Sequence, residues 1–291
     1  MATAPAHRFG QIIGEVLEAA VTPLLEEFAE QFGLYLDKKG DRPCRTGKKC
    51  SWLDLNGNTH DLDYVLERGG TAQKKGVPAA FIETAWRRYT KHSRNKAQEI
   101  QGAILPLVET YHNSAPFQGA ILAGVFTEGA LAQLRSLGFT VLYFPYETVI
   151  SVFRSYGIDA RFDEGTPDAD LKRRVSAYDS LSALRKKRLA KALLQANNAG
   201  VANFITSLTA VVSRQIERII ILPLHGTVRQ LDTVDEAISF IESYDEGASI
   251  NNFARYEIQV RYNNGNRVDG TFGDKKSAVQ FLRIYQPASI E

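Results

Sequence analysis

The chain has 291 residues, of which 44% are hydrophobic and 23% charged, and its formal net charge is +2. This length accommodates one large domain, or a medium domain and a small one. No apolar run reaches the roughly 18 residues of a membrane span, and the N-terminus lacks the pattern of a secretory signal. Two cysteines, Cys44 and Cys50, are too few for a disulfide framework. We therefore expect a cytoplasmic protein, in which the placement of charge is more informative than its total.

The first third of the chain predicts a helix followed by three strands. Apolar residues at helical spacing predict a helix over 8–33 that ends at Gly33. The polar, basic segment 37–50 predicts a loop. The stretches "SWLDL", "NGN" and "THDLDYVLE" predict a β-hairpin, because Asn-Gly suits left-handed turn positions. A third strand is expected over 77–86.

Helices and strands then alternate. We expect helices over 94–111, 127–138 and 146–156, and buried strands over 117–126 and 139–144. The whole order predicts an α/β fold of the mixed α+β kind, with a mixed β-sheet flanked by helices.

The second half has a different pattern. Thr166 and Pro167 start a predicted long helix over 165–200, and another helix is expected over 202–216. Two later stretches, "IIILPLHGTVRQLDTVDEAISFIESY" and "YEIQVRYNNGNRVDGTFGDKKSAVQFLRIY", both predict strand, turn, strand, helix, which is a degenerate ββα repeat. The chain is thus divided into a first domain over 1–160, a helical connector over 161–217, and a small C-terminal ββα-repeat domain over 218–291.

Acidic residues stand inside two of the predicted strands. Asp61 and Asp63 are two apart and should share a face, while Glu83 lies among apolar residues. If these strands are neighbours, Asp63 and Glu83 meet at the end of the sheet. Two close carboxylates do not both stay ionised without a cation, and Mg²⁺ prefers a few carboxylates with water and phosphate oxygens. Such an ion polarises a phosphodiester.

Cations follow the second acid closely. These cations are Arg87, Arg88, Lys91, His92, Arg94 and Lys96. They would hold a polyanionic substrate. The simpler alternative is that Asp63 and Glu83 form ordinary salt bridges with Arg87 or Arg88.

"HDLDYV", followed some twenty residues later by "AAFIETAW", resembles the motif of the PD-(D/E)XK nuclease superfamily, which includes the restriction endonucleases. The resemblance covers roughly residues 8 to 150. It implies a restriction-endonuclease-like core, with Asp63 and Glu83 as catalytic metal ligands.

One residue departs from that motif. The superfamily expects Lys two residues after the Glu, where this chain has Ala85. In some members the Lys has moved to the following helix, which makes Lys96 the first candidate for the third catalytic residue, Lys91 the second and Arg87 the third. His92 and Glu99 are possible supporting residues. Arg94 and a basic loop are expected to contact DNA, although the loop could equally be only solvated; its cations are Arg42, Arg45, Lys48 and Lys49.

The resemblance therefore predicts a Mg²⁺-dependent DNA endonuclease, most closely a type II-like restriction endonuclease. It implies double-stranded DNA as partner, a homodimer, and a cognate methyltransferase encoded nearby. For the C-terminal domain over 218–291 we then expect a role in DNA recognition or dimerisation. Two alternatives stay open: a repair, junction-resolving or phage-defence nuclease of the same fold, and a non-catalytic nucleic-acid-binding relative, which Ala85 favours.

Overall fold

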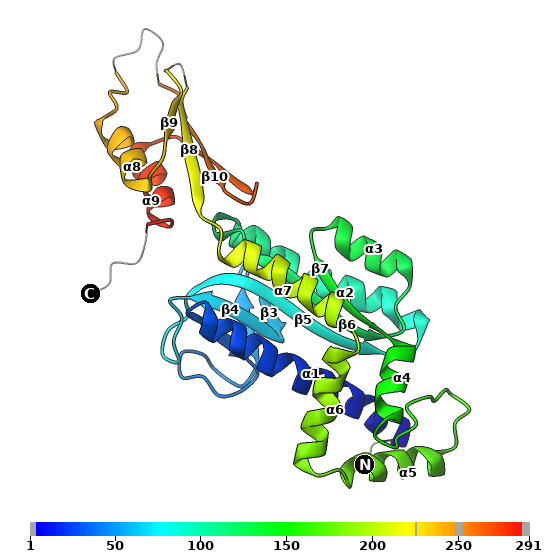
Figure 1. Ribbon diagram of the computed structural model, residues 1–291. Helices are drawn as coiled ribbons and strands as arrows, with labels where there is room; N and C mark the ends of the chain where they lie inside the picture. The colour runs from blue at the N-terminus through cyan, green and yellow to red at the C-terminus, as the bar shows by residue number, and fades with distance from the viewer. Residues whose placement is uncertain (1–3, 225, 248–252, 287–291) are drawn as a thin grey trace. The chain divides into compact units, whose positions relative to one another are not determined.

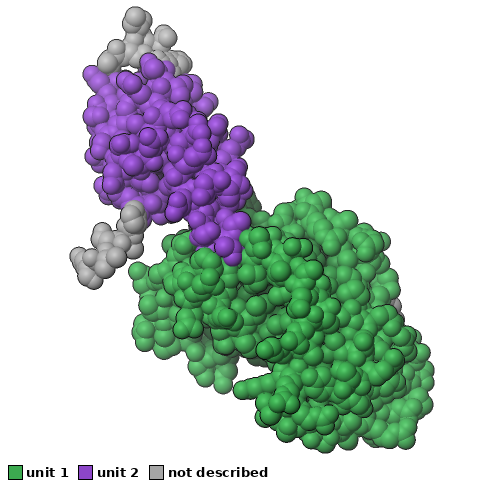
Figure 2. All heavy atoms as spheres, viewed as in Figure 1, with its two compact units in different colours: residues 1–110, 116–208 green, residues 111–115, 209–291 purple. Residues whose placement is uncertain are grey.

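The computed structural model describes residues 4–224, 226–247 and 253–286, apart from the side chains of Lys91 and His92. It contains two compact units, coloured separately in Figure 2. Unit 1 comprises residues 1–110 and 116–208, and unit 2 comprises residues 111–115 and 209–291. Among the residues described, no helix is both long and apolar enough to cross a membrane.

A five-stranded mixed sheet lies at the centre of unit 1. Its order is β1-β4-β5-β6-β7, with antiparallel pairing from β1 to β5 and parallel pairing from β5 to β7. Parallel neighbours need crossover connections, and helices supply them here. The strands are β1 (Leu34–Lys38), β4 (Tyr64–Arg68), β5 (Val77–Arg87), β6 (Phe117–Gly124) and β7 (Thr140–Pro145).

Helices flank this sheet, so the predicted mixed α/β class is confirmed (Figure 1). The first helix packs on β1 and β5, and the helix that connects β5 to β6 packs on both of those strands. The helices of this unit are α1 (Pro5–Gln31), α2 (Thr90–Thr110), α3 (Glu128–Ser136), α4 (Tyr146–Arg154), α5 (Asp168–Asp179), α6 (Ala183–Gln195) and most of α7 (Asn198–Val212).

The predicted strand over 59–67 is two strands in two different sheets. β3 (Thr59–Leu62) pairs with β2 (Cys50–Leu53) in a separate hairpin, whereas β4 joins the main sheet. The chain bends at Asp63 between them. The alternation that would place Asp61 and Asp63 on one face therefore does not continue through this point.

Two other element predictions need correction. The loop predicted from residue 37 begins later, because Asp37 and Lys38 belong to β1. This strand forms an edge of the main sheet and pairs with β4. The long helix expected over 165–200 is broken into α5, α6 and the start of α7, because Ser182 caps a new helix by accepting a hydrogen bond from the Arg185 N–H. Since α5 and α6 pack on α1, residues 161–208 belong to unit 1.

Unit 2 is built from two successive strand-strand-helix segments around one antiparallel sheet, in the order β11-β10-β8-β9. Its core lies between the sheet and the two helices, and includes Ile219, Ile258 and Phe281. The elements are β8 (Ile216–Pro223), β9 (Arg229–Leu231), α8 (Val234–Ser243), β10 (Tyr256–Tyr262), β11 (Arg267–Phe272) and α9 (Lys275–Arg283).

Candidate active site

Asp63 and Glu83 meet at the junction between β4 and β5. Tyr64 pairs with Ile82 in the antiparallel ladder, so the residues just beyond this pair face each other. The backbone N–H of Asp63 donates to Glu83 Oε1 over 3.1 Å. The bend before β4 therefore frees a backbone donor that holds the second acid in place.

Thr84 holds the side chain of Asp63. Its backbone N–H and its hydroxyl both donate to Asp63 Oδ2, each over 2.7 Å. Among the described residues, no hydrogen bond reaches Asp63 Oδ1. One carboxylate oxygen is thus anchored, and the other is left for a ligand. Sequence analysis missed Thr84, because a threonine beside a buried glutamate is ordinary in a strand.

Glu83 is buried in an unusual electrostatic position. It is 6% exposed, because both faces of β5 are covered from Pro78 to Ala85. This burial, together with the negative charge of Asp63, raises the pKa of Glu83 to about 8, against a partial lowering by Lys96. Lys96 therefore offsets the burial of Glu83 only in part.

Among the side chains that the structure describes, Lys96 is the cation that approaches Glu83. It projects from α2, with Nζ 3.7 Å from Glu83 Oε2 and 3.5 Å from Glu99 Oε2. Glu99 also lies 3.5 Å from Arg87, so it links the two cations. The helix after β5 thus brings a lysine to Glu83, whereas position 85, where the motif expects a lysine, is occupied by Ala85.

The remaining predicted cations are placed less tightly. Arg94 is exposed on α2. The side chains of Lys91 and His92, predicted as alternative or supporting residues, lie outside the described part of the structure. Of the two candidate lysines, Lys96 is therefore the one for which the structure gives contacts with acids, namely Glu83 and Glu99.

Glu18 of α1 is a third acid near this place that sequence analysis missed. Desolvation raises its pKa, and the negative charge of Asp63 raises it further. Glu18 stands beside the apolar stripe of α1, where acids are common, so no spacing in the sequence distinguishes it. The field at the site is consequently more negative than two acids alone would make it.

These residues fit a hard divalent cation with few protein ligands. In the described ranges, no group of three or more His, Cys, Asp or Glu side chains is arranged to hold a metal ion. Mg²⁺, however, is commonly bound through one or two carboxylates, with water and substrate phosphates completing its shell. Asp63 Oδ1 and the Glu83 carboxylate could serve as these ligands, and a bound cation would offset the burial and the negative charge of Asp63 that raise the pKa of Glu83.

The position of Arg42 corrects its predicted role in DNA binding. Its side chain is 1% exposed and lies against Glu67, which is fully buried, at 2.5 Å, and against Asp37 at 2.9 Å. Arg45, whose side chain is 5% exposed, also pairs with Asp37. These arginines neutralise buried acids and hold the loop after β1, so they are not available to phosphates.

Lys48 and Lys49 of the same loop are exposed. Lys48 lies 3.8 Å from Asp41, and Lys49 donates to Asp61 over 2.6 Å. Their predicted contact with DNA stays a prediction. Asp61 also accepts from Ser51, which ties it to the β2–β3 hairpin and away from the acid pair.

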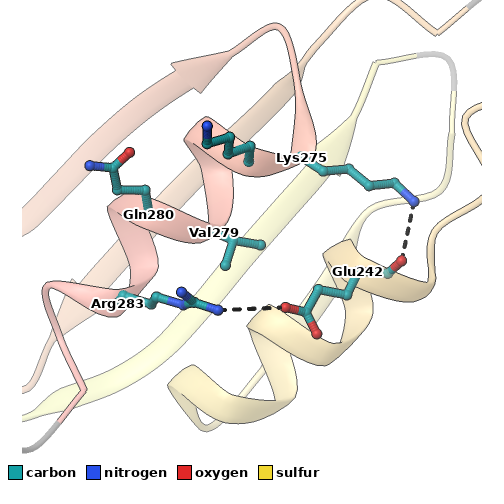
Figure 3. A pocket seen from close by; sticks show the side chains of 6 residues that line it. Glu242, Lys275, Val279, Gln280 and Arg283 are labelled. Carbon is teal, nitrogen blue, oxygen red and sulfur yellow. Dashed lines mark hydrogen bonds and ion pairs between the residues drawn. The ribbon is translucent and has the colours of Figure 1, made fainter.

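Two hollows elsewhere do not involve the acid pair. One, of about 620 Å³, lies in unit 1 between α1 and the helices α5 and α6. The other, of about 550 Å³, lies between α8 and α9 in unit 2, where Lys275 and Arg283 both approach Glu242 (Figure 3). Neither is lined by a predicted catalytic residue.

A scan against models of protein families finds none that matches this chain, and a search of the curated proteins finds no match. Among solved structures, one described as a protein of unknown function, AF1548, is similar over 68% of this chain and 98% of its own length. The two share 11% sequence identity with a TM-score of 0.27, which is too low to support a conclusion on fold or function.

Proposed function

We propose that unit 1 is a Mg²⁺-dependent endodeoxyribonuclease of the PD-(D/E)XK type, most closely a type II-like restriction endonuclease. One observation carries the proposal: Lys96 of α2 approaches Glu83 although the usual lysine position is Ala85. Asp63, Glu83 and Lys96 thereby come together with the residue types that phosphodiester hydrolysis needs.

Each of these side chains has a distinct task. Asp63, oriented by Thr84, and Glu83 would hold the ion, which when bound would act as a Lewis acid on the phosphodiester. Lys96 would orient the attacking water and stabilise charge that develops on the phosphate. Its 18% exposure leaves the ammonium group accessible to substrate.

The mixed sheet supports the same proposal. A restriction-endonuclease-like core would be expected to contain a helix, antiparallel strands and a crossover helix to a parallel strand, and unit 1 has such elements, with Glu83 on β5 and Asp63 at the bend before β4. Double-stranded DNA is then the substrate. Cutting both strands would call for a homodimer, and protection of host DNA would call for a methyltransferase encoded nearby.

Cleavage of unmethylated plasmid and phage DNA, with Mg²⁺ or with EDTA, tests the proposal. Glu83→Gln and Lys96→Met should each lower the rate by about 100-fold or more. Lys172→Met, which removes an exposed lysine of α5, is the matched control and should cut like the wild type. Cleavage by Lys96→Met at the control's rate would rule out the role of Lys96.

The products also separate the related functions. Discrete Mg²⁺-dependent fragments would indicate a restriction enzyme, whereas a smear would indicate a repair or defence nuclease. Ala85 favours a second candidate, a nucleic-acid-binding relative without catalysis. DNA binding in EDTA, with intact DNA in Mg²⁺, would support that candidate instead.

A further inference from the structure

The sheet of unit 2 has two unlike faces. Helices α8 and α9 pack with one face, where Ile219, Ile221, Ile258 and Val260 are buried. Side chains alternate across a strand, so the residues between these point to the opposite face. That second face carries charged and polar side chains together with Ile220 and Leu222, which are half-buried.

Three arginines lie side by side on this second face. Arg218 of β8 pairs with Arg261 of β10, and Arg261 pairs with Arg267 of β11. Directly opposed residues have Cβ atoms about 4.5–5.5 Å apart. We call these three residues the arginine row. Like charges placed directly opposite each other destabilise a sheet, so the row is not explained by the stability of the fold.

Neighbouring side chains compensate the arginine row only in part. Arg218 contacts Glu217, and Arg267 lies 3.3 Å from Asp269, but both pairs are solvent-exposed and such pairs are weak. Arg261 donates to Gln259 Oε1, a neutral acceptor, over 2.5 Å. The row therefore keeps the capacity to bind a further anion.

The rest of the face differs from this end. The row next to the arginines has Ile220, Gln259 and Asp269 side by side, and the following row has Leu222, Glu257 and Thr271. Positive charge is thus concentrated in one line across three strands. A line of guanidinium groups is suited to a linear polyanion, because each group can bind phosphate oxygens in a fork.

We propose that the arginine row binds the phosphate backbone of duplex DNA. The choice of DNA among polyanions rests on the nuclease function proposed for unit 1. Strands are known to dock in DNA grooves, and phosphate contacts fix the register of a protein on the duplex. The row would hold DNA in place and contribute little sequence readout of its own.

A binding experiment with two charge-matched variants tests this. In one, Arg218, Arg261 and Arg267 are all changed to Gln. In the control, three cations of α9, on the helix side of the same unit, are changed to Gln; these are Lys275, Lys276 and Arg283, of which Figure 3 labels Lys275 and Arg283. Each variant loses three positive charges. Binding to a fluorescein-labelled DNA duplex is measured by anisotropy in EDTA, between about 50 and 200 mM salt.

The arginine variant should bind at least about 10-fold more weakly, and its plot of log K against log salt should be shallower by about 2 to 3. The control should change affinity by less than about threefold. Equal losses of DNA affinity in both variants would show that only net charge matters, and would contradict a specific role of the arginine row. Unchanged binding in the arginine variant would overturn the proposal and indicate a protein-contact surface.

Two further measurements keep the result interpretable. Changing the same three arginines to Lys should retain most of the affinity, even if the Gln variant unfolds unit 2, and a loss of binding in this folded Lys variant would argue against a simple backbone contact. Cleavage in Mg²⁺ is scored separately. DNA binding that depends on the arginine row, without any cleavage, would support this inference and contradict the proposed nuclease function. Cleavage, with DNA binding that does not depend on the row, would support the nuclease function and contradict this inference.

Discussion

Replacing Glu83 with Gln should make the metal-free protein more stable, by an amount that depends on pH. The fold raises the pKa of Glu83 from an ordinary 4.5 to about 8. Below pH 4.5 the residue is protonated in both folded and unfolded chains, and its contribution to stability is fully present. As pH rises towards 8 the unfolded chain releases the proton but the folded chain keeps it, so that stability is lost.

The magnitude follows from the proton affinities. Each tenfold change in proton affinity corresponds to about 1.4 kcal/mol. Ionisation of Glu83 therefore lowers the free energy of unfolding by up to about 5 kcal/mol above pH 8, and by less than about 1 kcal/mol at pH 5. Gln has nearly the same shape and no charge to desolvate. Allowing for movement of the side chain towards water, we expect Glu83→Gln to be more stable than the wild type by about 2–4 kcal/mol at pH 9.

Urea unfolding at pH 5, 7 and 9 in EDTA is the assay, with tryptophan fluorescence as the signal. Both tryptophans of the chain, Trp52 and Trp86, belong to unit 1, so the signal reports on that unit. The difference between variant and wild type cancels the titration of other groups. A difference that does not change with pH, or a variant that is less stable at pH 9, would refute the reasoning.

Three other substitutions follow from contacts in the structure. Arg42→Leu leaves the buried carboxylate of Glu67 without its main partner and should lower the free energy of unfolding by about 3–5 kcal/mol in the same urea assay, while DNA affinity of the folded protein stays unchanged. Thr84→Val removes the hydroxyl that anchors Asp63, and calorimetry should show about 10-fold weaker Mg²⁺ binding, whereas Thr84→Ser should bind like the wild type. Gly124→Ala adds a methyl group 2.1 Å from a backbone oxygen at a residue with φ of +100°, so urea unfolding should show a loss of about 2–4 kcal/mol; a loss below 1 kcal/mol would contradict this.

The local patterns of the sequence were sufficient to predict the acid pair. Glu83 stands out because the strand around it is apolar on both faces. Asp63 stands out because it precedes Glu83 by 20 residues, a spacing that fits the motif. Lys96 could be ranked first because some members of the superfamily that the motif resembles carry this lysine on the following helix, whose N-terminus should face the acids. In each case the relevant neighbours lie within one or two elements of the chain.

Contacts over longer distances could not be predicted in this way. The loop after β1 has the composition of a solvated basic segment, and nothing in it shows that Arg42 turns inward to Glu67, 25 residues further on. Glu18 likewise depends on how α1 lies against the sheet. The break at Ser180–Ser182 was missed because serines at this spacing also occur within helices, and the Ser182 cap is seen only in the structure.

The buried charges of β1, β4 and the loop after β1 have an evolutionary consequence. Asp37, Arg42, Arg45 and Glu67 form an enclosed group of two acids and two bases, so a change of charge at one position leaves an uncompensated ion in the interior. Single substitutions that invert or remove charge should therefore be eliminated by selection, whereas coordinated replacements can survive. In a library randomised at all four positions and selected for folding, the survivors should be sets whose charges sum to zero, with uncharged sets among them.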